Sequence, residues 1–192
     1  MITTGELREA RFDPVFAVHG LFRRVLDATA RPGLVVDLGE LALTVPPPRL
    51  RPACALLLSL MDDEVSFHVL GPDAERIRTY LRFNTGARAT VLADADFVLF
   101  TASGLPWPDA PREGATVVCV PDSLSNSTAV ADVVLHLQGP GIPGERRLLV
   151  QGLRRDDLAP LLGDGAVPMG IELWLAAAAG SLAVITRSTR CQ

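Results

Sequence analysis

The residues of this sequence best suited to chemistry are arginines next to hydroxyl side chains. Residues 187–190 are Arg-Ser-Thr-Arg, close to the end of the chain. The guanidinium of Arg187 and the hydroxyl of Thr189 are groups that bind phosphate oxygens. A solvated C-terminus explains the same residues equally well. With Arg23 and Arg82, which fall on predicted helices, Arg187 suggests an anion- or nucleotide-binding module as one hypothesis.

A single carboxylate, Glu172, stands in an apolar strand predicted over residues 171–177, with Trp174 and Ala176 on its face. Burial of a carboxylate costs free energy unless the group is paired or hydrogen-bonded. Two interpretations stay open. Glu172 forms a structural ion pair with an arginine, or it is a polar group of a site at the edge of a sheet.

The chain contains no lysine, and all 18 of its basic side chains are arginine. Codon bias in a GC-rich genome is the favoured explanation. The chemical consequence holds regardless, because no side-chain amine is available for a Schiff base with pyridoxal phosphate. A P-loop lysine is excluded in the same way. We therefore expect that this chain does not bind pyridoxal phosphate as a cofactor.

Metal-ligand spacing is missing among the histidines and cysteines. The three histidines are isolated, and the three cysteines are odd in number and far apart, so neither a zinc site nor a disulfide framework is predicted. An acidic triplet at residues 62–64 could bind a metal or a magnesium nucleotide. A solvated turn is the preferred interpretation of that triplet.

A glycine-rich stretch at residues 139–144, GPGIPG, matches the pattern GxGxxG. Pro140 and Pro143 remove backbone N–H donors that would bind a pyrophosphate, and a strand is predicted after it rather than a helix. A dinucleotide site is rejected for these reasons. The stretch, which includes Gly139 and Gly141, is predicted to be a tight hairpin turn or, alternatively, a loop that contacts a subunit or a ligand.

The elements that must position these residues begin with an amphipathic helix in residues 13–33. Asp13 is suited to cap it, and Arg31-Pro32-Gly33 ends it, because proline disfavours the helical conformation of the residue before it. Its apolar side is predicted to include Phe22 and Leu26. Asp27 lies four residues from both Arg23 and Arg31, so an ion pair with either is expected.

Strands alternate with helices along the rest of the chain. Strands are predicted over residues 34–38, 66–70, 97–101, 116–120, 133–138, 148–151, 171–177 and 182–187. Helices are predicted over residues 53–61 and 154–162, the latter interrupted by Pro160, and a further helix is opened by residues 71–73 and ended by residues 82–86. Residues 123–128 are predicted to be a polar loop. This pattern indicates an α/β protein, a sheet covered by helices, with residues 1–192 as one domain.

Composition narrows the class of protein further. The hydrophobic content of 48% and charged content of 21% are typical of a globular protein. A net charge of −4 argues against a surface that coats nucleic acid. Since no apolar run reaches about 18 residues and no secretory signal is present, we expect no membrane span and a cytoplasmic location.

Residues 22–33, FRRVLDATARPG, resemble a motif near the N-terminus of the H subunit of the carbon–phosphorus lyase system, which breaks down phosphonates. Four more segments resemble this family in the same order: residues 81–87 (LRFNTGA), 137–142 (LQGPGI), 168–175 (PMGIELWL) and 185–190 (ITRSTR). The sequence departs from the family pattern at Asn84, Glu172 and Thr186, where histidine, aspartate and proline are usual.

The resemblance implies a role in the core complex of this lyase, with the G, I and J subunits as partners. That complex uses a phosphonate and MgATP, and adenine is displaced to form ribose 1-phosphonate 5-triphosphate. The resemblance also implies a homodimer. It further implies a three-layer fold, a mixed β-sheet flanked by helices, like the large domain of pyridoxal-phosphate-dependent transferases but without the cofactor lysine.

No catalytic residue can be assigned from these motifs. The candidates for binding a substrate or anion, or for forming an interface, come from the matched segments and the adjoining arginines. They are Arg23, Asp27, Arg82, Gly139, Gly141, Gly170, Glu172, Arg187 and Thr189.

Overall fold

The computed structural model describes residues 16–41, 43–45, 47–162 and 170–191. Four α-helices are present in this part of the chain: α1 (Phe16–Ala30), α2 (Arg51–Leu60), α3 (Ala74–Thr85) and α4 (Arg155–Leu162). Two short 3-10 helices, η1 (Pro48–Leu50) and η2 (Leu92–Asp94), lie between them. The predicted cap Asp13 lies outside the described residues.

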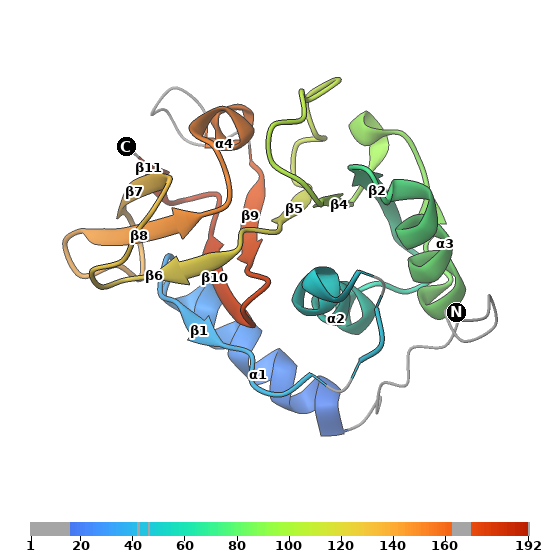
Figure 1. The fold of residues 1–192 in the computed structure, drawn as a ribbon, viewed down its shortest axis with the longest axis horizontal. Coiled ribbons are helices and arrows are strands. Elements are labelled where there is room, and N and C mark those ends of the chain that lie inside the picture. The colour runs from blue at the N-terminus through green and yellow to red at the C-terminus, as the bar shows by residue number, and fades with distance from the viewer. Residues whose placement is uncertain (1–15, 42, 46, 163–169, 192) are drawn as a thin grey trace.

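The central element is a seven-stranded mixed sheet in the order β1-β10-β9-β5-β4-β2-β3 (Figure 1). Its strands are β1 (Val36–Asp37), β2 (Ser66–Leu70), β3 (Arg88–Ala89), β4 (Phe97–Phe100), β5 (Thr116–Cys119), β9 (Glu172–Ala176) and β10 (Ser181–Ile185). The five strands from β9 to β3 are parallel, whereas β10 and β1 add to β9 as an antiparallel edge.

A second, antiparallel sheet has the order β11-β7-β8-β6. It consists of β6 (Ser123–Ser125), β7 (Val133–Gln138), β8 (Arg146–Gln151) and β11 (Arg190–Cys191). The predicted strand at residues 133–138 is confirmed, and GPGIPG forms the turn between β7 and β8, as expected of a hairpin. The predicted polar loop at residues 123–128 is wrong in part, because residues 123–125 pair with β8 through their backbone whatever their side chains.

Side chains alternate between the two faces of the seven-stranded sheet and form two separate cores. On β9, for example, Trp174 and Ala176 pack against the helices, whereas Leu173 and Leu175 pack against the second sheet and α4. The mixed α/β sheet predicted from the sequence is confirmed. Helices α1, α2 and α3 cover one face (Figure 1). The other face is covered mainly by the second sheet, a layer that the prediction of flanking helices did not contain.

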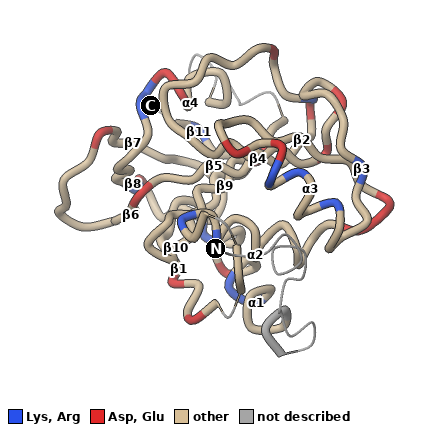
Figure 2. Tube along the Cα trace, turned by 45° about the vertical axis from the view of Figure 1, so that its right-hand side comes forward, with Lys and Arg blue, Asp and Glu red and all other residues tan. Residues whose placement is uncertain are grey.

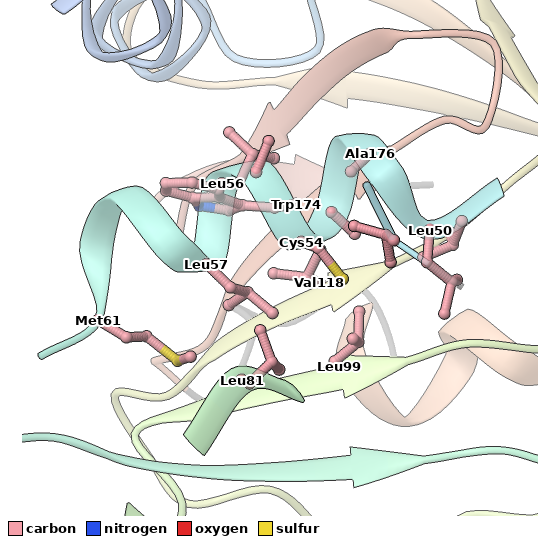
Figure 3. Close-up of a cluster of buried hydrophobic side chains, with 14 of the residues drawn as sticks. Leu50, Cys54, Leu56, Leu57, Met61, Leu81, Leu99, Val118, Trp174 and Ala176 are labelled. Carbon is pink, nitrogen blue, oxygen red and sulfur yellow. The ribbon is translucent and has the colours of Figure 1, made fainter. Parts of the chain in front are cut away.

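Helix α2 is the most deeply buried of these helices. The predicted buried helix is confirmed, since residues 52–57 are all buried between α1, α3 and the sheet. Figure 3 shows Cys54, Leu57 and Leu81 of the helices packed over Leu99 and Val118 of the sheet. Burial raises the pKa of the Cys54 thiol to about 12, so this thiol stays protonated at neutral pH.

Helices α1 and α3 follow the predicted periodicity with one correction. On α3, Ile77, Tyr80 and Leu81 point inward and Gly86 ends the helix, as predicted. On α1, however, Phe22 and Leu26 are 46% and 53% exposed, so their predicted burial is wrong. The buried stripe of α1 is narrower than predicted and consists of Leu21, Val25 and Ala28, because one row at this spacing suffices to contact the sheet.

Some expectations stay predictions. The likeness to the large domain of pyridoxal-phosphate-dependent transferases and the single domain over residues 1–192 are among them.

In the described part of the chain, no helix is both long enough and apolar enough to cross a bilayer. Basic and acidic positions are interspersed along the chain (Figure 2).

Leu81 tests how tightly the helix-side core is packed. Its side chain is fully buried, so Leu81→Ala should lower the free energy of unfolding by about 2–5 kcal/mol through lost contacts and a residual cavity. Val130 is 80% exposed and provides the control, since Val130→Ala should change stability by less than about 0.5 kcal/mol. Urea denaturation measures both, and equal effects would contradict the described packing.

Asp96 links the amino ends of three adjacent strands. Its Oδ2 accepts hydrogen bonds from the Ser66 backbone N–H (2.8 Å) and hydroxyl (2.6 Å), and its Oδ1 accepts one from Arg112 (2.5 Å). These contacts, the Ser66 hydroxyl first, hold the pKa of the Asp96 carboxyl below its usual value despite some desolvation.

The lowered pKa of Asp96 predicts a pH-dependent contribution to stability. A carboxyl with a depressed folded-state pKa stabilises the fold fully above its unfolded value of about 3.9, and this contribution is lost as the pH falls through the folded pKa. Asp96→Asn should therefore be less stable than the wild type at pH 7, and the difference should shrink below about pH 4. Denaturation at several pH values measures this, and a constant difference would contradict it.

Candidate functional site

Three of the motif segments meet where α1 ends, and we call this meeting point the α1 junction (residues 31–33, 139–144 and 188–190). Arg146, which follows the β7–β8 turn, donates through Nη1 to the carbonyl oxygens of Arg31 (3.0 Å) and Pro32 (2.6 Å). Carbonyl groups at the end of a helix need such donors. The Arg-Pro-Gly stop is thus held by a side chain more than a hundred residues away in the sequence.

The glycines of the turn permit close backbone contacts at this junction. At Gly141, with φ of +78°, a Cβ atom would lie 2.5 Å from the carbonyl oxygen of Ala30. At Gly139 it would lie 3.0 Å from the carbonyl oxygen of Ser188. Gly139 and Gly141 are therefore required for packing of the turn against α1 and the C-terminal segment.

Asn126 joins a further segment to the same junction. Its Nδ2 donates to the carbonyl oxygens of Gly33 and Arg147, both at 2.9 Å, and its Oδ1 accepts from the Val35 N–H at 2.8 Å. This amide was not among the predicted site residues. Its signal in the sequence was weak, because one asparagine in a polar loop is common.

Thr189, a predicted anion-binding candidate, is fully buried. Its hydroxyl lies 3.0 Å from that of Thr186, and its backbone N–H donates to the Thr186 carbonyl oxygen at 2.9 Å. The hydroxyl thus faces the interior of the C-terminal turn. Beside this turn an open pocket of about 410 Å³ is lined by residues 138–140, 142, 144, 188 and 190.

Glu172 and Arg187, both candidates, are brought together. Their side chains form an ion pair of 3.8 Å at the start of β9, in agreement with the first of the two interpretations of Glu172. The predicted burial of Glu172 is wrong, because its side chain is 24% exposed. Glu172 is the first residue of its strand and therefore reaches solvent at the amino edge of the sheet. Gly170 precedes this strand and lies beside Glu113.

The remaining candidates lie on helices. Asp27 of α1 pairs with Arg31, just after the helix, which confirms one of the two predicted ion pairs, while Arg23 is exposed on α1. Arg82 is exposed in the last turn of α3. These two arginines therefore lie on different helices, α1 and α3.

A second pocket lies on the carboxyl side of β9, and we call it the edge pocket. It has a volume of about 510 Å³ and is lined by residues 39–41, 43, 44, 48, 51, 52 and 178–180. The wall at residues 178–180 is the turn between β9 and β10, which is tied by backbone hydrogen bonds to Pro121 and Asp122 after β5. Ligands of open α/β sheets bind at this carboxyl edge of parallel strands.

The predicted anion-binding arginines do not contribute to either pocket. Arg23, Arg82 and Arg187 are absent from the linings of the edge pocket and of the pocket beside the C-terminal turn. The proposed grouping of these three residues in one anion site therefore has no support in the geometry of these pockets.

A different arginine lines the edge pocket, and another lies next to one of its lining residues. Arg51, the first residue of α2, lines it. The guanidinium of Arg24 lies against Gly39, where a Cβ atom would be only 2.9 Å from Cζ. Sequence reasoning selected Arg23 from the arginine pair at residues 23–24 and missed Arg24.

Comparison with known proteins identifies the family. A family model described as "Bacterial phosphonate metabolism protein (PhnH)" matches residues 10–192. The chain belongs to the PhnH family. This membership confirms the resemblance to the H subunit of carbon–phosphorus lyase and associates the chain with bacterial phosphonate metabolism. No curated protein sequence matches the chain significantly.

In this member of the PhnH family, the recognised motifs contribute to two different places. The end of the first motif, the glycine turn and the C-terminal segment form the α1 junction, where their polar groups bind one another. The beginning of the first motif places the Arg24 guanidinium against Gly39, which lines the edge pocket. The junction therefore has a structural role, whereas the edge pocket is lined by exposed charged side chains.

Arg146 tests the structural role of the α1 junction. Arg146→Gln removes two hydrogen bonds from a charged donor to carbonyl groups, which should cost about 1–3 kcal/mol in the free energy of unfolding. Arg147 is a matched control on the same strand, since its side chain is exposed, and Arg147→Gln should change stability by less than about 0.5 kcal/mol. Equal effects of the two variants would contradict the proposed role of Arg146.

Proposed function

We propose that this chain is a subunit of the carbon–phosphorus lyase core complex, with the G, I and J subunits as partners. In that role it supports the ATP-dependent formation of ribose 1-phosphonate 5-triphosphate, in which a phosphonate displaces adenine. MgATP is then a substrate of the complex, which acts in the cytoplasm. The match of the PhnH family model to residues 10–192 is the observation on which this proposal rests.

The chemistry of the described residues favours a supporting role over independent catalysis. Cys54 and Cys119 are buried nucleophiles, and burial raises the pKa of both thiols, so neither is available as a thiolate. Within the described ranges, no three histidine, cysteine or acidic residues form a group that could hold a metal ion. The chain also contains no lysine for pyridoxal phosphate.

The exposed face of α1 supports protein association. Phe22 and Leu26 are four residues apart and about half exposed, so they form a small apolar surface on one side of the helix. Arg23 and Asp27 lie on the same helix, and Asp27 pairs with Arg31 just after it. We propose that this face contributes to the homodimer that the family resemblance implies.

A stand-alone anion- or nucleotide-binding module is the second candidate function. The edge pocket favours it, because this pocket is lined by charged side chains of the chain itself. The two candidates differ in their need for partners. The first requires assembly with the other lyase subunits, whereas the second requires only ligand binding.

Co-expression with the G, I and J subunits of the same organism tests the first candidate. We expect one assembly that contains all four subunits and elutes together in size-exclusion chromatography. Phe22→Ser with Leu26→Ser should reduce the amount of dimer and of assembly, because it removes the apolar surface of α1. Val130→Ser, at another exposed apolar position, is the control and should leave both unchanged. Failure of the subunits to co-purify would refute this candidate.

A further inference from the structure

We propose that the edge pocket binds a small organic phosphate or phosphonate that also has an amine or hydroxyl group. The oxyanion would bind to Arg51 and Arg24, and the amine or hydroxyl group to Glu40. The choice of phosphate or phosphonate chemistry rests on the proposed function in phosphonate metabolism, whereas the position of the site rests on the structure alone.

The location of the edge pocket fits a ligand site. Arg49, within η1, donates to the carbonyl oxygen of Val120 at 3.3 Å, so the start of α2 is attached to the carboxyl end of β5. The turn at residues 178–180 places the carboxyl end of β9 on the opposite wall. Its volume of about 510 Å³ is within the range of small-molecule sites.

Two guanidinium groups near this pocket are free to bind a ligand. Arg51 and Arg24 are both exposed, and neither side chain makes a hydrogen bond or ion pair within the described part of the chain. Gly39, with φ of +68°, leaves the space that the Arg24 guanidinium occupies, and any side chain there would displace it. Guanidinium groups bind phosphoryl oxygens through paired N–H donors, which gives both affinity and orientation.

The carboxylate of Glu40 makes the site selective. Glu40 lines the same pocket as Arg51, so a ligand with only a phosphate or phosphonate group would meet the repulsive charge of Glu40 as well as the attractive charges of the two arginines. An amine or hydroxyl donor on the ligand turns the repulsive contact into a favourable one. The hydroxyl of Thr44, which is exposed at the pocket, offers a further polar contact.

Calorimetric titration of the full chain with ethylphosphonate, 2-aminoethylphosphonate and ribose 5-phosphate tests this inference. We expect the probes with an amine or hydroxyl group to bind about tenfold more tightly than ethylphosphonate. Arg51→Gln should weaken binding of all three about tenfold or more, and Arg24→Gln should weaken it in the same direction. Glu40→Gln should abolish the preference for the amine or hydroxyl group.

Arg76→Gln, at an exposed arginine of α3 away from the pocket, is the matched control and should bind as the wild type does. Circular dichroism melting confirms that each variant is folded. The inference is overturned if no probe binds to the chain, either alone or in the assembled complex, or if Arg51→Gln binds as tightly as the wild type. Binding without assembly would refute only the lyase-subunit proposal, and assembly without binding would refute only this inference.

Discussion

The central strands β4, β5 and β9 have apolar side chains on both faces, and each face must be removed from water. Trp174 and Leu173, neighbours on β9, belong to different cores. At roughly 25 cal/mol per Å² of apolar surface, leaving one face exposed would cost more than the net stability of a domain. The helices on one side and the second sheet on the other are therefore both necessary parts of the fold.

The same requirement explains where polar groups are found. Charged side chains would lose their hydration inside the sheet, so they lie at its two edges and on the outer surfaces. Asp96, Glu172 and Arg187 lie at the amino edge, where they hold strands together. Arg51 and Glu40 lie near the carboxyl edge, beside a pocket. Of these two groups, only the second has charges without partners in the described structure, which is why the ligand site is proposed there.

The family motifs are also best understood through packing. Glycine, proline and arginine recur in them because three segments far apart in sequence meet at the end of α1. Gly141 contacts the backbone of α1, and Arg146 binds the carbonyl groups that follow this helix. A motif that suggests anion binding can thus have a structural role, since the groups that bind an anion also bind a carbonyl oxygen.

Much of the fold followed from local patterns in the sequence, whereas the tertiary structure alone decided which distant residues became neighbours. The inward side of α3, the buried α2 and the turn at GPGIPG depend on periodicity and on glycine and proline, which act over a few residues.

The same local reasoning placed Phe22 in the core, because periodicity cannot give the width of the contact between a helix and the sheet. It also missed β6, whose side chains are mostly polar. Glu172 pairs with Arg187. The arginine that lines the edge pocket is Arg51, with Arg24 next to Gly39, and neither was among the predicted arginines. The sequence determined the absence of lysine, the family and the local elements, because these depend on residue identity and short spacing. The site depends on the order and direction of strands, which burial of both sheet faces sets together.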